Sequence, residues 1–189
     1  MRTCLNNGKH EAGFTLTELI TIIAIMAVLT SIAIPTFSVW LPNYKLRSAA
    51  RDLYSNLQMA KMGAVKQNKQ WAVVFNQGSA QYSICSDDGA NNVWDGPGGD
   101  DDCERTVNLG DYDDIDFGHA TINKGVADEL FSSGTHIYYG GLNFVVFGPR
   151  GTSDKGYVYL QNNKNTVYGV GTRPGGVIHL KKWTGSAWD

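Results

Sequence analysis

One acidic residue at the start of a long uncharged run constrains this chain more than any other feature. After Glu18, the 26 residues from Leu19 to Tyr44 carry no formal charge. A helix needs roughly 20 predominantly apolar residues to cross a bilayer core. The run therefore predicts a membrane-spanning helix that begins near Phe14, and the chain after Tyr44 is polar enough to be soluble.

Two prolines, Pro35 and Pro42, lie where this helix would leave the membrane. Proline removes a backbone donor, and its ring clashes with the preceding helical turn. We expect the helix to be kinked or interrupted near these positions.

Glu18 separates three interpretations of the run: a cleaved secretory signal, a plain anchor, and a segment that uses the carboxylate. Ser31-Ile-Ala33 fits the small-residue cleavage site of a secretory signal. Against that signal stand the 18 residues that precede the run, with Glu11 among them, and a proline two positions beyond Ala33. A plain anchor does not explain an acid that costs at least ~2.5 kcal/mol in hydrocarbon. Glu18 is therefore expected to have a partner.

The residues around Glu18 resemble a known signal. A polar leader ends in Gly13 and is followed by Phe14-Thr-Leu-Thr-Glu18 and an aliphatic helix with a proline at Pro35. This pattern resembles the class III signal of type IV pilins and type II secretion pseudopilins. The resemblance implies that a prepilin peptidase cleaves between Gly13 and Phe14 and methylates the new amine. It also implies that the hydrophobic run is kept, and that the partners are other pilins and an inner-membrane assembly platform.

Elementary electrostatics agrees with this resemblance. Cleavage would place a positive amine on Phe14, four residues from Glu18, so the two charges can neutralise one another within a subunit or between neighbours. Pairing between subunits is what the family implies. The leader residues Arg2 and Lys9 outweigh Glu11, which predicts a cytoplasmic N-terminus and a periplasmic body of a single-pass bacterial inner-membrane protein.

The remaining length suits one modest domain. With the leader removed and about 30 residues in the anchor, roughly 140 residues remain. The formal net charge of −2 becomes −3 when Arg2, Lys9 and Glu11 are lost, so no global basic field recruits nucleic acid. The expected parts are a leader (1–13), the transmembrane half of the helix (14–36), its amphipathic half (37–68) and a periplasmic β-rich domain (69–189).

The cysteines predict one disulfide. Cys4 lies in the leader, which leaves Cys85 and Cys103 as a pair in an oxidising compartment. Closing their 18-residue separation would stabilise the fold by roughly 3 kcal/mol on the chain-entropy model. Metal ligation is less favoured, because no CxxC and no nearby histidine completes a zinc set.

Downstream of Pro42 the apolar residues recur in steps of three and four, which predicts a helix face that packs against a sheet. That face comprises Leu46, Ala50, Leu53, Leu57, Ala60 and Ala64. From Trp71 onward the chain changes to short β-type runs separated by turn signals. These runs are WAVVFN, AQYSIC, LNFVVF, GYVYLQ, TVYGVG and GVIHLKKW, of which the last three predict an antiparallel meander. The predicted fold is α+β and pilin-like: a long N-terminal helix whose amphipathic half packs on an antiparallel β-sheet domain.

The order of these elements carries a second resemblance. The helix 51–66, the strand 71–75, Phe147-Gly-Pro-Arg-Gly151 and the closing segment 168–178 resemble the minor pseudopilins and pilins called GspH/FimT. The resemblance implies a structural subunit that supports type II secretion or pilus biogenesis. Enzyme signatures are missing, because the histidines are scattered and no HExxH or GxSxG occurs, so the chain is predicted not to be an enzyme.

An acidic loop between the two cysteines offers hard oxygen ligands of the kind that calcium prefers. Its carboxylates are Asp87, Asp88, Asp95, Asp100, Asp101 and Asp102. Their spacing does not match an EF-hand, and a solvated loop is the alternative interpretation. A second acidic cluster follows at residues 111–116.

Basic residues near the C-terminus suggest an alternative function. Arg173, Lys181 and Lys182, with Trp183 and Trp188 close by, have the composition of a patch that grips DNA. An ordinary amphipathic edge strand is the other interpretation. FimT proteins of DNA uptake carry a C-terminal glycine-arginine-x-arginine motif, and the corresponding run 176–179 lacks both arginines. A structural subunit is therefore the leading hypothesis, and a DNA-binding minor pilin of a competence pilus is the alternative.

Overall fold

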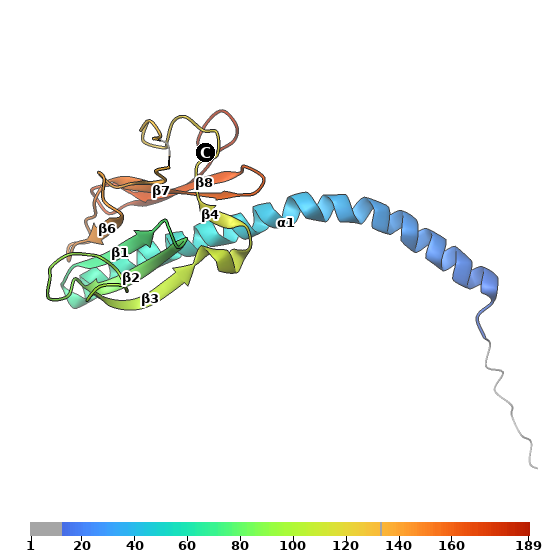
Figure 1. Ribbon diagram of the computed structural model, residues 1–189, viewed down its shortest axis with the longest axis horizontal. Helices are drawn as coiled ribbons and strands as arrows, with labels where there is room; N and C mark the ends of the chain where they lie inside the picture. The colour runs from blue at the N-terminus through green and yellow to red at the C-terminus, as the bar shows by residue number, and fades with distance from the viewer. Residues whose placement is uncertain (1–12, 133) are drawn as a thin grey trace, which may run out of the picture. The chain divides into compact units, whose positions relative to one another are not determined.

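The computed structural model describes residues 13–132 and 134–189, which divide into two units with the boundary between Val39 and Trp40. The leader residues Arg2, Cys4, Lys9 and Glu11 lie outside the described residues. Figure 1 shows one long helix followed by the strands of the C-terminal unit. The chain is thus α+β with antiparallel sheets, as the sequence predicts.

Helix α1 runs without a break from Leu16 to Gln67. It passes through both Pro35 and Pro42, so the expectation of an interruption was wrong, whereas a kink near these residues stays a prediction. Each proline removes only one bond of the helical ladder. The turns on either side keep their own bonds, and prolines are tolerated in this way in membrane helices.

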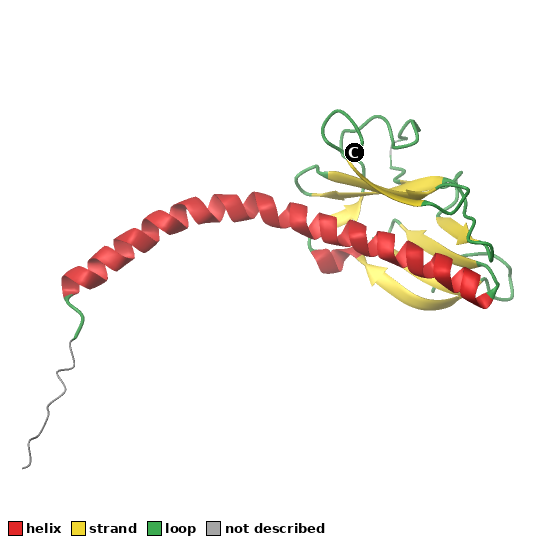
Figure 2. Cartoon of the chain, turned by 180° about the vertical axis from the view of Figure 1, so that it is seen from behind, coloured by secondary structure: helices red, strands yellow, loops and turns green. Residues whose placement is uncertain are grey.

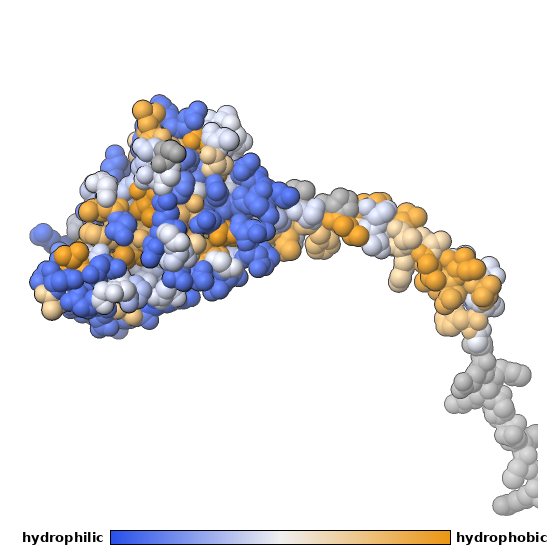
Figure 3. All heavy atoms as spheres, viewed as in Figure 1, coloured by the Kyte–Doolittle hydropathy of each residue, from blue (hydrophilic) through white to orange (hydrophobic). Residues whose placement is uncertain are grey.

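The first part of α1 has the properties of a membrane span. Its stretch Leu16–Ile34 is long and apolar enough to cross a bilayer, and none of it is buried within the protein. Hydrophobic residues predominate along it in Figure 3. The hydroxyls of Thr30 and Ser31 donate to the carbonyls of Met26 and Val28, at 2.6 and 2.7 Å, so these polar groups are satisfied by the helix itself.

The second part of α1 buries one face against the sheets (Figure 2). The buried residues include all six of the predicted stripe, together with Ala49. Small residues let the helix approach closely: a Cβ atom built on Gly63 would lie 2.7 Å from the indole ring of Trp71. The common core contains residues from both sheets, for example Phe75 and Val170.

The strands form two antiparallel sheets. The first has the order β3-β2-β1-β6 and the second the order β4-β7-β8-β9, with β5 also paired to β7. The elements of the first sheet are β1 (Trp71–Asn76), β2 (Gln81–Asp87), β3 (Asp102–Asn108) and β6 (Phe144–Phe147). Those of the second are β4 (Ile115–Phe117), β5 (Ile137–Tyr138), β7 (Gly156–Asn162), β8 (Val167–Thr172) and β9 (Ile178–Lys182). A 3₁₀ helix, η1 (Leu109–Tyr112), precedes β4.

All six predicted β-type runs are strands, and β7, β8 and β9 form the predicted meander. The sequence did not predict β3, β4 or β5, nor the division into two sheets. β3 is an edge strand with mostly exposed residues and so lacks the alternating apolar pattern. β4 and β5 have three and two residues, which is too short for a periodic signal.

The close contact between Gly63 and Trp71 gives a testable prediction. Gly63→Ala adds a methyl group that overlaps the buried indole, and overpacking of this kind costs about 1–3 kcal/mol. This loss should outweigh the gain in helix propensity of about 1 kcal/mol from replacing glycine. Guanidinium unfolding of the full chain in detergent, followed by tryptophan fluorescence, should show a lower midpoint.

Gly98→Ala is the matched control for this change, because nothing lies within 4 Å of a Cβ atom at Gly98. The control should leave the midpoint near that of the unaltered chain. A midpoint raised by Gly63→Ala would contradict the close packing of α1 on β1.

Candidate functional site

The predicted processing site lies directly before α1. Gly13, Phe14 and Thr15 have no regular secondary structure, and the helix begins at Leu16. Phe14 is 79% exposed, and a Cβ atom at Gly13 would have no neighbour within 4 Å. The peptide bond between Gly13 and Phe14 therefore lies in an exposed, non-helical segment.

Glu18 caps the helix that it begins. Its Oε2 accepts from the backbone N–H of Thr15 at 3.1 Å and from the Thr15 hydroxyl at 3.0 Å. In return, the Thr15 Oγ1 accepts from the backbone N–H of Glu18 at 3.2 Å. This reciprocal arrangement is a capping box, which satisfies two backbone donors at the start of a helix.

The capping box identifies a residue that the sequence interpretation missed. Thr15 was not selected as functional, although threonine three residues before glutamate at the start of an apolar run is the sequence pattern of this cap. Only Oε2 of Glu18 is used by Thr15, so Oε1 is left for a further cation. The carboxylate therefore has a partner in its own chain before any subunit contact is made.

The disulfide between Cys85 and Cys103 is present, as predicted, and joins β2 to β3. Because the two sulfurs are bonded to one another, they do not serve as thiolate ligands for a metal. Cys85 packs with Trp94 and Val74 on the outer face of the first sheet. The acidic loop is thus held at its base by the disulfide and near its middle by Trp94.

The loop brings together three of the six predicted calcium ligands. One carboxylate oxygen from each of Asp95, Asp100 and Asp101 lies within 4.8 Å of the others. The other three, Asp87, Asp88 and Asp102, are outside this group, and Asp87 instead pairs with Lys69 at 3.7 Å. The group is an oxygen ligand set of the type that suits calcium, and calcium binding stays a prediction.

The same carboxylates organise the loop backbone. Asp100 Oδ2 accepts from the N–H groups of Ala90 and Asn91 at 2.8 and 3.2 Å, and Asp101 Oδ2 accepts from that of Gly96 at 2.7 Å. Burial raises the pKa of the Asp101 carboxyl, and the nearby charges of Asp95 and Asp100 act in the same direction. The loop conformation therefore depends on three acids that repel one another.

The predicted C-terminal basic residues do not share one face. Successive side chains of a strand point to opposite sides. On β9, Ile178 and Leu180 pack on the common core, which puts Lys182 on that side of the sheet and Lys181 on the other. Burial, then the charges of Arg173 and Lys181, lowers the pKa of His179, so the field of both cations reaches this histidine. Lys182 lies on the other side of the sheet from Lys181.

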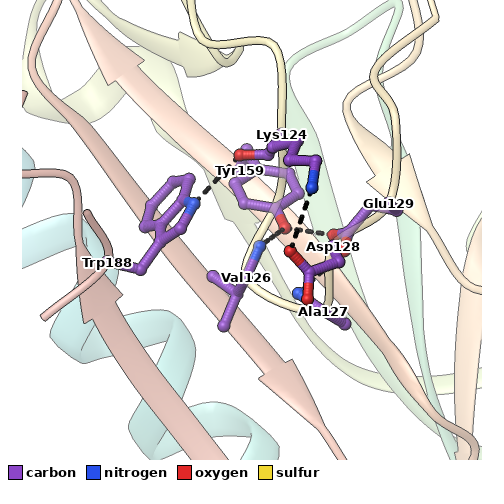
Figure 4. A network of polar contacts seen from close by, with 7 residues as sticks. All are labelled: Lys124, Val126, Ala127, Asp128, Glu129, Tyr159 and Trp188. Atoms are coloured by element: carbon purple, nitrogen blue, oxygen red, sulfur yellow. Dashed lines mark hydrogen bonds and ion pairs between the residues drawn. The ribbon is translucent and has the colours of Figure 1, made fainter. Parts of the chain in front are cut away.

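The neighbouring tryptophans are part of the domain packing. Trp183 and Trp188 form a β-bridge, and the ring of Trp188 lies 5.4 Å from that of Tyr159. Trp188 Nε1 donates to the carbonyl of Lys124 at 3.0 Å (Figure 4). The half-buried indoles therefore pack against the protein, and DNA contact by Arg173, Lys181 and Lys182 stays a prediction.

Figure 4 also shows the polar contacts beside Trp188. The Tyr159 hydroxyl donates to Glu129 Oε1 and accepts from the N–H of Val126 at 2.8 Å, while Glu129 Oε2 accepts from the N–H of Ala127 at 2.8 Å. Burial, followed by the hydrogen bond to Glu129, raises the pKa of the Tyr159 phenol. The contacts tie the segment before β5 to the outer face of the second sheet.

Two protein-family models match this chain. The model of the type II transport protein GspH matches residues 49–176, and that of the prokaryotic N-terminal methylation motif matches residues 8–34. The chain is 35% identical over 85 residues to the pilin-like protein PilA1 of Thermus thermophilus. That match covers 44% of this chain and 53% of the relative, so it spans about half of the relative's length.

Two solved structures are similar to the chain. The minor pseudopilin EpsH from the type 2 secretion system of Vibrio cholerae is 11% identical, with a TM-score of 0.48 over 72% of this chain and 95% of that one. The type IV minor pilin FimU of Pseudomonas aeruginosa is 16% identical, with a TM-score of 0.49 over 76% and 97%.

The acidic loop predicts a pH-dependent effect of Asp101→Asn. A raised carboxyl pKa means that the native state binds the proton more readily than the unfolded chain, so this group's stabilising contribution is lost as pH rises. The amide oxygen of asparagine can still accept the hydrogen bond from the Gly96 N–H. Because asparagine carries no charge, the substitution also removes the repulsion from Asp95 and Asp100. Thermal unfolding should therefore show a higher midpoint for Asp101→Asn at pH 7.5, with the difference shrinking as the pH is lowered towards 4.

Asp88→Asn is the control, since it makes the same change in the same loop outside the group of three acids. A lower midpoint for Asp101→Asn at pH 7.5 would show that the charge stabilises the loop. The same melts with added Ca²⁺ test the calcium prediction, which requires a rise that the unaltered chain shows and Asp101→Asn does not.

Proposed function

Because this chain belongs to the family of the type II transport protein GspH, we propose that it is a structural minor subunit of a type II secretion pseudopilus or a type IV pilus. The observation that carries the proposal is the presence of two matches on one chain. The methylation motif covers the start of α1, and the family match covers its packed half and most of the β domain. The family is one of structural pilins, so the proposed role is assembly rather than catalysis.

The proposed route begins in the inner membrane, where the methylation motif and the apolar stretch of α1 fit anchoring of a pilin. A prepilin peptidase then cleaves between Gly13 and Phe14 and methylates Phe14. Support comes from the exposed, non-helical position of this bond immediately before the helix. The domain after α1 is periplasmic in this proposal and enters a filament through the N-terminal helix.

Glu18 has a defined place in this route. A carboxylate in the membrane needs a compensating partner, because an unpaired charge in a low-dielectric medium is strongly destabilised. Thr15 supplies neutral donors in the uncleaved chain. After cleavage, the amine of Phe14 supplies a cation, and in a filament the amine of a neighbouring subunit does so. Docking is then favoured because it pairs two charges that lipid cannot solvate.

Variants of Glu18 separate its charge from its role as a cap. Glutamine at this position keeps the capping box but carries no charge, whereas alanine removes both. We expect Glu18→Gln and Glu18→Ala to insert into the membrane, but to be incorporated into sheared filaments at least about tenfold less than the unaltered chain, since buried ion pairs contribute this much or more. Immunoblots of membrane and filament fractions measure both steps.

Each result for the two Glu18 variants has a clear meaning. Normal incorporation of both would sink the charge-pairing role. Normal incorporation of Glu18→Gln with loss of Glu18→Ala would assign the role to the cap. N-terminal sequencing of the mature protein tests the processing itself: Phe14 is the expected first residue, and Ile34 would instead indicate a cleaved secretory signal.

The alternative role in DNA uptake makes a separate prediction. Of its three basic residues, Lys181 and Lys182 lie on opposite sides of the sheet, Arg173 and Lys181 both act on His179, and Trp188 is packed against the domain. Nonspecific affinity for DNA comes mainly from clustered cations and falls with salt. We expect the full chain in detergent to retain no more duplex DNA at low salt than Arg173→Ala/Lys181→Ala does. Retention that this double variant abolishes would favour the alternative.

A further inference from the structure

The exposed side of α1 just beyond its apolar stretch carries an unusual set of residues. The four residues are Tyr44, Arg47, Ser48 and Arg51. Arg47 and Ser48 lie three and four positions after Tyr44, and Arg51 lies four and three positions after them, so the set shares one face of the helix. Tyr44, Arg47 and Arg51 are exposed and Ser48 is half-buried. This set is called the arginine face below.

A shallow groove lies along the arginine face. It has a volume of about 260 Å³ and is lined by the four residues of the face and by Asp52. The carboxylate of Asp52 is already engaged, because its Oδ2 accepts from the Tyr112 hydroxyl. The groove therefore offers two guanidinium groups beside one acid that the domain already uses.

Among the described residues, Arg47 and Arg51 form no ion pair and no hydrogen bond. The neighbouring cation Lys45, in contrast, does form an ion pair, with Asp113 at 2.5 Å. This contact lowers the pKa of the Asp113 carboxyl. Two like charges four residues apart on a helix cost a few tenths of a kcal/mol. Asp52 is the acid that lines the same groove, and among the described residues it forms no ion pair with either arginine. The two guanidinium groups are therefore suited to an acidic partner outside the chain.

Aromatic residues extend the arginine face towards the apolar stretch. Tyr44 stacks on Trp40 with ring centroids 5.3 Å apart, and the two residues remain 57% and 56% exposed. Tryptophan, tyrosine and arginine are the residue types that dominate the binding energy of protein interfaces. The face thus combines rigid apolar area with forked cationic donors.

We propose that the arginine face docks a carboxylate-bearing helix of a different pilin-type subunit. The inference rests on the proposed function, because it names the partner of α1 within a filament. A guanidinium presents two parallel N–H groups that match a carboxylate, so Arg47 and Arg51 select acidic side chains spaced by about one helical turn. Trp40 and Tyr44 then pack on apolar residues of the same partner.

A second copy of this chain does not fit the groove. The helical residues 40–67 contain one acid, Asp52, which is held by Tyr112. They contain five cations: Lys45, Arg47, Arg51, Lys61 and Lys66. Two such helices would place like charges against each other, which disfavours their association. The chemistry therefore indicates a different subunit.

Lipid headgroups are the other source of negative charge near this part of the chain. Arg47 and Arg51 follow Ile34, the last residue of the apolar stretch, by 13 and 17 residues. At 1.5 Å per residue this is about 20 and 26 Å of helix. The headgroup layer on one side of a bilayer is only roughly 5–8 Å thick. Both arginines therefore lie well beyond that layer when the helix stands upright in the membrane.

Photo-crosslinking of the full chain in cells that assemble its filament tests the proposal. The photoreactive probe p-benzoylphenylalanine replaces Ser48, which lies between the two arginines, and mass spectrometry maps the adduct. The expected adduct is to a carboxylate-bearing helix of another pilin-type subunit. Charge reversal by Arg47→Glu/Arg51→Glu should lower its yield about tenfold or more, in line with loss of interface hot spots. Lys66→Glu/Lys155→Glu makes the same charge change at exposed residues outside the face and should leave the yield unchanged.

Other outcomes overturn the proposal. An adduct to lipid, to a second copy, or to a segment without carboxylates would do so, as would equal yields from the two double variants. Incorporation of the probe-free chain into sheared filaments is measured alongside. Normal incorporation without the expected adduct rejects only the arginine face, whereas absence of the unaltered chain from filaments rejects the proposed function and the docking with it.

Discussion

Helix α1 has to satisfy two different surroundings with one continuous backbone, and the rest of the structure depends on how its sequence does so. Over Leu16–Ile34 the side chains are predominantly apolar on every side, as lipid requires, and Glu18 is the exception. From Leu46 onward only one side is apolar, and that side is rich in alanine. Because alanine and Gly63 allow close approach, both sheets can share the same helix face, and the outer faces of the sheets are left for the disulfide loop and the segment before β5.

The sequence predicts best where a pattern repeats. The stripe on α1, the six apolar runs and the meander are periodic, and the structure has all of them. β3 was not foreseen because it is defined by pairing with β2 and by the disulfide, both of which are contacts between residues distant in sequence. The effect of Pro35 and Pro42 was overestimated for a related reason: local propensity was considered without the long ladder on either side.

The candidate site was predictable in chemistry but not in geometry. Composition indicated oxygen ligands in the acidic loop, yet only folding shows that Asp95, Asp100 and Asp101 meet while Asp87 turns to Lys69. Composition also suggested a cationic patch near the C-terminus, whereas strand alternation separates Lys181 from Lys182. Thr15 shows the opposite case: its cap on Glu18 is a local pattern that the sequence alone could have revealed.

Some charged side chains of this chain form contacts within the domain, and others form none or only part of those they could form. Lys45 and Asp52 are fixed by Asp113 and Tyr112, and these contacts hold η1 and its flank against α1. Glu18 is only half used, through one oxygen, and Arg47 and Arg51 are not used at all among the described residues. The two arginines do not stabilise an isolated domain, since like charges on one helix repel each other. In an assembled subunit such charges contribute binding specificity, because each favours a neighbour of opposite charge and disfavours one of like charge.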